Sequence, residues 1–135
     1  MYIMEVEYDD YNDNHRKEKL MFHLNEAEIA EMQLGHKGGL TAYINRVTQG
    51  QDNVALANLF KEFVTKAYGV KSDDGKRFIK NKEVLDEFMQ SEAYPIVYMK
   101  LATDDVEAAK FMKEVLSKKL QAEVAKAEAA NKPVV

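Results

Sequence analysis

Hydrophobic and polar residues alternate at the start of the chain. The apolar positions of the first alternating segment are Tyr2, Met4, Val6 and Tyr8. After a polar stretch from Asp9 to Lys17, a second segment alternates through Leu20, Phe22 and Leu24. A period of two residues is typical of half-buried strands, so the sequence predicts a β-hairpin over residues 1–24. Because an isolated hairpin is marginally stable in water, we expect it to pack on helices or to pair with another subunit through its open edge.

Helical patterns replace the alternation after the hairpin. Asn25 and Glu28 have the spacing of a capping box, which predicts a short helix from about Glu26 to Gln33, ended by Gly35. A second helical stretch is predicted from Leu40 to about Thr48, after a glycine break. The glycines of HKGGLTAY are interpreted as turn elements, because no buried strand precedes them and the spacing of a phosphate-binding loop is absent.

The clearest apolar stripe belongs to the next predicted helix. This helix is expected to be capped by Asp52 or Asn53 and to run to Tyr68, where Gly69 is expected to supply a left-handed stop. Its apolar residues are Leu56, Phe60, Phe63, Val64 and Ala67.

A connector then leads into a pair of predicted helices. Ser72–Gly75 predicts a tight turn, and Arg77–Ile79 predicts a short extended piece. Asn81 caps the first helix, and Pro95 suits the first turn of the second, because proline lacks only an amide hydrogen that would be unpaired there. Their apolar positions are Val84, Leu85, Phe88 and Met89, then Ile96, Val97, Met99 and Leu101.

The last helix is predicted to be capped by Thr103. Its inward positions are predicted to be Val106, Ala109, Met112, Val115 or Leu116, and Leu120. The following sequence, QAEVAKAEAANKPVV, has high helix propensity and little to bury. We therefore expect residues 121–135 to be a frayed or disordered helical tail, or a segment that orders on a partner.

The fold class predicted by these elements is α+β, mainly α. A hairpin over residues 1–24 precedes a compact bundle of about five to six helices over residues 25–120, with a long C-terminal helix. At 135 residues and 15.4 kDa, we expect one globular domain over residues 1–120. The sequence lacks cysteine, long apolar runs and a signal-peptide pattern at its start, and we expect a cytosolic protein.

Neither a catalytic set nor a metal site can be assembled from the sequence. Ser72–Gly75 lacks the alternating oxygen ligands and closing glutamate of a calcium loop. The aspartates Asp9, Asp10 and Asp13 fit a solvated loop, and the histidines His15, His23 and His36 lack the spacing of a helical metal pair. We predict that the chain is not an enzyme and holds no cofactor or metal.

The sequence allows more than one role for a group of basic residues and for a group of methionines. The basic residues Lys66, Lys71, Lys76, Arg77, Lys80 and Lys82 fit a single-stranded nucleic-acid surface, a solvated connector or a site for an acidic partner. A net charge of −4 argues against nucleic acid, and we expect no membrane surface. The methionines Met89, Met99 and Met112 fit either a core or a surface that accepts partner helices.

The run NLFKEFVTKAYGVKSDDGKRFIKNKEVLDEFMQSEAYPIVYMKLATDDVEAAKFM resembles the tail assembly chaperones of long-tailed (siphovirus-like) phages. The preceding FHLNEAEIAEMQLGHKGGL also resembles that family, so the likeness extends from about Glu18 to Met112. Its most distinctive pieces are YGVKSDDGKRFIK, SEAY before Pro95, and MKLATD.

The resemblance implies a non-enzymatic assembly factor of the infected host cytoplasm. Such a chaperone binds the tape measure protein, keeps it soluble and helps the tail tube protein to polymerise around it. Self-association and absence from the mature virion are further expectations, and many such phages make a longer product by frameshifting. The other classes left open are a structural tail or neck component and a small nucleic-acid-binding phage protein.

A groove that captures partner helices is the physical mechanism we expect for such a protein. The residues predicted to lie in or beside it are Phe60, Phe63, Phe88, Tyr94, Tyr98 and Met99. The alternative interpretation places most of these side chains in the core.

Overall fold

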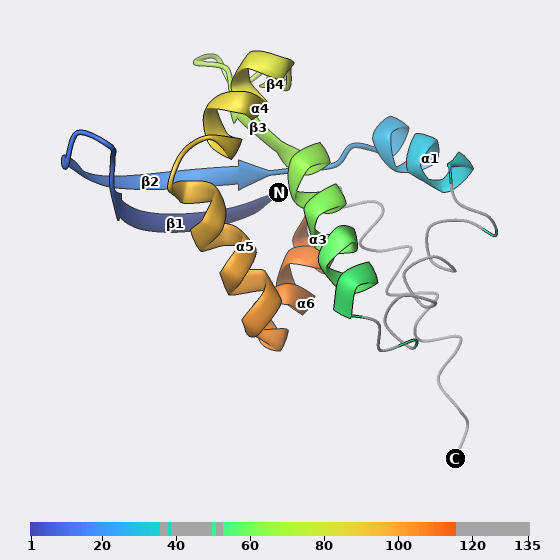
Figure 1. Ribbon diagram of the computed structural model, residues 1–135. Coiled ribbons are helices and arrows are strands. Elements are labelled where there is room, and N and C mark those ends of the chain that lie inside the picture. The colour runs from blue at the N-terminus through green and yellow to red at the C-terminus, as the bar shows by residue number, and fades with distance from the viewer. Residues whose placement is uncertain (36–37, 39–49, 51–52, 116–135) are drawn as a thin grey trace.

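A computed structural model describes residues 1–35, 38, 50 and 53–115 (Figure 1). Within these ranges the chain forms four strands and five helices, which confirms the predicted α+β class. The predicted helix from Leu40 to Thr48, the extension of the last helix to Leu120, and the tail over residues 121–135 lie outside the described residues.

The predicted hairpin is present. Strand β1 (Tyr2–Asp9) pairs antiparallel with β2 (His15–Phe22), so that Tyr2 faces Phe22 and Asp9 faces His15. The loop is shorter than the predicted polar stretch, because Asp10 organises a tight turn: its Oδ1 accepts hydrogen bonds from the backbone amides of Asn12 and Asn14 at 2.9 and 3.0 Å. The second strand therefore begins at His15, among polar residues that show no apolar alternation.

Two short strands extend the hairpin into a sheet with the order β1-β2-β3-β4. Strand β3 (Tyr68–Lys71) pairs with β2, and β4 (Phe78–Ile79) pairs with β3. The predicted left-handed stop at Gly69 is wrong, because Gly69 lies within β3 and pairs with Met21. A Cβ atom on Gly69 would lie 2.6 Å from Cε2 of Phe78, so the glycine allows the Phe78 ring to cover the strand.

The turn between β3 and β4 is the predicted one. The amide of Gly75 donates to the carbonyl of Ser72 at 2.9 Å, and Gly75 has a φ of +74°, which glycine adopts without strain. The side chain of Asp74 accepts hydrogen bonds from Ser72 Oγ and from the amide of Lys76. Ser72–Gly75 is therefore a turn held by its own side chains.

The first described helix, α1 (Glu26–Leu34), begins with the predicted capping box. Asn25 Oδ1 accepts from the amide of Glu28 at 2.8 Å, and Glu28 Oε1 accepts from the amide of Asn25 at 3.1 Å. Glu28 Oε2 also pairs with Lys80 Nζ at 2.6 Å, and Lys80 donates to the carbonyl of His23. One lysine thus ties the end of β2, the start of α1 and the segment after β4 together.

Helix α3 (Asn53–Ala67) carries the predicted apolar stripe. Its buried residues are Leu59, Phe60, Phe63, Val64 and Ala67. Helices α4 (Lys82–Met89) and α5 (Ala93–Thr103) follow, with the predicted Asn81 cap on α4 and Pro95 in the first turn of α5.

The start of the last described helix, α6 (Asp105–Glu114), differs from the prediction. Asp104 caps it by accepting from the amide of Glu107 at 3.1 Å. Thr103 instead belongs to α5, where its hydroxyl donates to the carbonyl of Met99 at 2.7 Å. A serine or threonine in a last helical turn can bond backward to a carbonyl, which removes it from capping.

The inward face of α6 also differs in part from the prediction. Its buried side chains are Ala108 and Phe111, followed by Val115 after the helix, whereas Val106 is 79% exposed and Ala109 is exposed. Phe111 sets this face, because its ring meets Tyr2 edge-on with centroids 5.1 Å apart.

The core lies between the sheet and the helices. Figure 1 shows α3, α5 and α6 together on one side of the β1–β2 hairpin, while α1 lies at the end of the sheet opposite the β1–β2 turn. The largest fully buried side chains are Tyr2, Phe22, Phe63, Phe111, Leu24, Leu59 and Leu101. The outer face of the hairpin is charged, with Lys17 Nζ 2.9 Å from Glu5 Oε1. The apolar alternation of the hairpin therefore marks the face that packs on the helices.

Candidate functional site

A concave surface lies between the hairpin and the α4–α5 junction. It consists of two neighbouring hollows of about 390 Å³ each, which share Tyr8 and Glu92. The first is lined by Tyr8, Asp10, Tyr11, Arg16, Glu18, Leu20, Tyr68, Val70, Val84, Glu87, Phe88, Ser91, Glu92 and Ala93. The second is lined by Tyr8, Asp9, Glu92, Pro95, Ile96 and Met99. We call the two together the hairpin–α5 groove.

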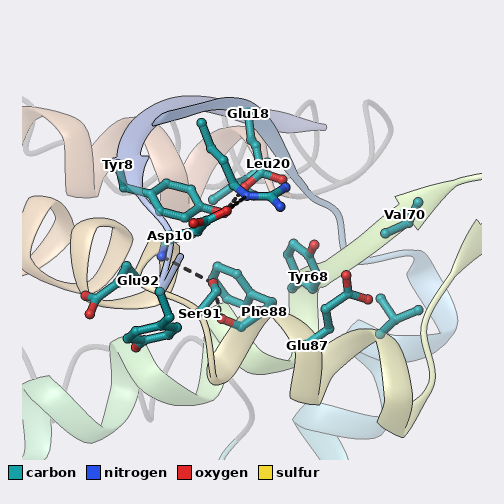
Figure 2. Close-up of a pocket in the computed structure, with 14 residues that line it drawn as sticks. Tyr8, Asp10, Glu18, Leu20, Tyr68, Val70, Glu87, Phe88, Ser91 and Glu92 are labelled. Atoms are coloured by element: carbon teal, nitrogen blue, oxygen red, sulfur yellow. Dashed lines mark hydrogen bonds and ion pairs between the residues drawn. The ribbon is translucent and has the colours of Figure 1, made fainter. Parts of the chain in front are cut away.

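Figure 2 shows how the walls of the first hollow are built. Tyr8, Glu18 and Leu20 come from the hairpin, while Glu87 and Phe88 come from α4. The turn end of the β1–β2 hairpin extends beyond α5 in Figure 1. The groove therefore lies where the hairpin meets the α4–α5 junction.

Exposed apolar side chains border the second hollow. Met99 is 55% exposed, and it shares one side of α5 with Pro95 and Ile96, at helical spacing. Tyr11, in the hairpin loop, is 73% exposed and lines the first hollow. These side chains offer a contact surface for an apolar partner.

The charges around this surface are predominantly negative. Five carboxylates line the groove, on Asp9, Asp10, Glu18, Glu87 and Glu92, against one guanidinium, on Arg16. Arg16 Nε pairs with Asp10 Oδ2 at 2.7 Å, and this contact lowers the pKa of Asp10. Within the described part of the chain, Glu87 and Glu92 have no ion-pair partner, whereas Glu18 accepts a hydrogen bond from Tyr8 and lies near Arg16. Glu87 and Glu92 are therefore the carboxylates open to a cationic ligand.

Burial and the nearby carboxylates raise the pKa values of the tyrosines that line the groove. Burial raises the pKa of Tyr8 to about 12, assisted by the hydrogen bond that its hydroxyl donates to Glu18. Burial also raises the pKa of Tyr68, and the charges of Glu18 and Glu87 add to that effect. The hydrogen bond to Glu92 raises the pKa of Tyr11. These hydroxyls therefore stay neutral near pH 7 and remain hydrogen-bond donors.

The six residues predicted for partner contact occupy different environments. Phe60 and Phe63 are buried at 8% and 1% exposure on α3, outside the groove. Phe88 is 3% exposed and lines the first hollow. Tyr94 and Tyr98 are half-buried on α5. Met99, the most exposed of the six, lines the second hollow.

Three of the six belong to one row of aromatic rings. The row runs through Phe22, Tyr68, Phe88, Tyr94 and Tyr98, with successive centroids 5.7, 4.2, 5.6 and 6.1 Å apart. It connects the fully buried Phe22 with the half-buried rings of α5. Aromatic pairs at these separations pack favourably, so the row supports the helix that forms one wall of the groove.

Several groove residues were not among the predicted ones. Tyr8 and Ile96 were assigned to apolar faces, and Tyr11 and Glu92 were assigned no role. An exposed tyrosine within a polar loop was the available signal for Tyr11, because large aromatic side chains are uncommon there. The contact between the hairpin and α5 depends on tertiary structure that local patterns do not encode.

Two of the basic residues considered in the sequence analysis make local contacts, and the acidic residues form no metal-binding group within the described ranges. No group of three or more histidine, aspartate or glutamate residues that could hold a metal ion occurs in the described ranges. Among the basic residues, Lys80 is bonded to Glu28 and His23, and Lys66 lies 4.0 Å from Glu62. The helices within the described ranges are too short or too polar to cross a membrane.

Comparison with known families decides the identity. A protein-family model described as phage tail assembly chaperone matches residues 1–135, which is the whole chain. The chain belongs to the phage tail assembly chaperone family. This confirms the resemblance and extends it beyond Glu18–Met112 to both ends. No curated protein and no solved structure shows significant similarity to the chain.

Family membership fixes the general role of this tail assembly chaperone. It implies a non-enzymatic function in building phage tails and an interaction with tail proteins. The groove is consistent with that role, because it offers apolar contact area and charged side chains to a protein partner.

Proposed function

We propose that this tail assembly chaperone binds the tape measure protein, keeps it soluble and assists polymerisation of the tail tube protein around it. The observation that carries the proposal is the family match over the whole chain. The hairpin–α5 groove supports it, because its exposed apolar residues could cover part of an unassembled client.

The mechanism needs binding and release but no covalent step. An unassembled helical client exposes apolar stripes that would otherwise associate with one another. Pro95, Ile96 and Met99 would shield such a stripe along α5. Tube subunits would then displace the chaperone as they surround the client, because they cover a larger area of the same surface.

The chaperone would act in the host cytoplasm and be absent from the mature virion. Several copies along one client would favour self-association. The open edge of β1 is poorly suited to pairing with its own copy, because Glu5, Glu7 and Asp9 alternate along its outer face. We therefore place contacts between copies on another surface.

Co-expression with the cognate tape measure protein tests the proposal. The tape measure protein should move from the pellet to the soluble fraction when the chain is present, and the two should elute together from a sizing column. A control culture expresses an unrelated protein of similar size. Equal insolubility of the tape measure protein in both cultures would refute the proposed function.

A further inference from the structure

We infer that the hairpin–α5 groove selects a basic amphipathic helix, whose apolar stripe is flanked by lysine or arginine. The inference rests on the proposed function for the identity of the client, a tail protein. It adds the chemistry by which the client is recognised, and it assigns this recognition to one surface of the chain.

The apolar part of the groove requires the client helix to carry an apolar stripe. Pro95, Ile96 and Met99 form a short stripe on α5, with Tyr8 on the opposite wall. A helix that presents apolar residues at three- and four-residue spacing would pack on such a stripe. The polar groups offered here are side-chain carboxylates, which suits a partner whose own backbone hydrogen bonds are already satisfied within a helix.

The carboxylates of the groove require the client helix to carry basic residues beside that stripe. Glu87 and Glu92 line the groove without an ion pair in the described part of the chain, while Arg16 is held by Asp10 and lies near Glu18. Cations flanking the apolar stripe would meet these carboxylates, whereas an acidic helix would be repelled. A second copy of the chain is a less suitable occupant, because each copy carries a net charge of −4.

Two synthetic peptides of about 18 residues provide the probe, since that length gives a helix of about five turns. Both contain the same leucine and alanine stripe, flanked by lysine in one peptide and by glutamate in the other. Fluorescence anisotropy with the full chain should show at least about tenfold tighter binding of the lysine peptide in about 50 mM NaCl, and a clear loss of that preference in about 500 mM NaCl.

Substitutions assign the binding to the groove. Met99→Asp should weaken binding of the lysine peptide about tenfold or more, because it places a charge in the apolar stripe. Val106→Asp is the matched control: Val106 is 79% exposed on α6 and lies outside both hollows, so binding should be unchanged. Combined Glu87→Gln and Glu92→Gln should reduce the lysine preference at low salt. Circular dichroism verifies that each variant is folded.

Three results of the peptide-binding and oligomer measurements would overturn the inference. They are equal binding of the two peptides, equal loss of binding with Met99→Asp and Val106→Asp, and conversion of an oligomer to a monomer by Met99→Asp without peptide binding. The last would assign the groove to self-association. If Met99→Asp still solubilises the tape measure protein as the native chain does, the inference fails and the proposed function stands. If the lysine peptide binds as expected but the client stays insoluble, the proposed function fails.

Discussion

The rings of Tyr68 and Phe88 stack face to face, with centroids 4.2 Å apart and planes inclined by 14°. Tyr68 begins β3 and Phe88 lies in α4, so this contact joins the added part of the sheet to the helices. Phe88 also meets Phe22 and Tyr94 edge-on. One side chain therefore connects the buried core, the sheet and the wall of the groove.

Phe88→Ala should destabilise the chain strongly. Phe88 is 3% exposed and contacts three other rings, so truncation loses buried area and leaves a cavity. We expect the free energy of unfolding in urea to fall by about 3–5 kcal/mol. Tyr98→Ala, at the half-buried end of the row, should have a smaller effect. Similar losses for the two variants would contradict the role assigned to Phe88.

The β3 strand shows where local patterns give a wrong prediction. The helical stripe of α3 continues in the sequence to Tyr68, and a glycine follows, which together predict a helix end and a left-handed stop. The structure instead pairs Tyr68 with Phe22 and Gly69 with Met21. These partners lie more than forty residues away in the sequence, so local propensity could not predict the pairing.

Gly69→Ala tests whether Gly69 is needed to make room for the Phe78 ring beside β3. The added Cβ would lie 2.6 Å from the Phe78 ring, which must move away from β3 and from Lys80, whose Nζ lies 5.6 Å from the ring centroid. We expect a loss of about 1–3 kcal/mol in the free energy of unfolding. In a Phe78→Leu background the same substitution should cost less. Equal costs in both backgrounds would show that the ring contact is not the reason for the glycine.

The N-cap of α6 gives a prediction that can be compared with a substitution at the preceding residue. Asp104→Ala removes the acceptor of the Glu107 amide and should lower the thermal midpoint by about 5 °C. Thr103→Ala removes only a bond to a carbonyl within α5 and should have a smaller effect. Differential scanning calorimetry measures both midpoints. A larger fall in the thermal midpoint for Thr103→Ala would show that Thr103 caps α6, as the sequence predicted.

His23 predicts a dependence of stability on pH. Burial chiefly lowers its pKa, assisted by the N-terminal ammonium and Lys80, while Glu28 opposes this shift. The unfolded chain therefore binds the proton more readily. The stabilisation is present above the unfolded pKa of about 6.5 and is lost as pH falls through the lowered folded value.

Urea unfolding at about pH 7.5 and about pH 5.5 measures this loss. The free energy of unfolding should fall between the two, and His23→Asn should remove much of the fall. The control is His15→Asn, since His15 is exposed in the hairpin and paired with Asp9. If both substitutions flatten the pH dependence equally, His23 is not its source.

The site could be predicted only in part from the sequence. Phe88, Tyr94, Tyr98 and Met99 do lie in the groove or in the aromatic row that supports it. Phe60 and Phe63 share their apolar character but face the core, because helical spacing marks an apolar side without saying what covers it. The acidic wall arises where α4 and α5 meet the hairpin, which only the folded chain shows.

The proposed function requires the chain for tail assembly but not in the mature virion. Electron microscopy of lysates tests it most directly, using the encoding phage with an early stop codon in this gene. We expect heads without tails, restoration of tails by the native gene on a plasmid, and no trace of the chain in purified particles by mass spectrometry. Normal tails in the stop-codon phage, without the plasmid, would contradict it.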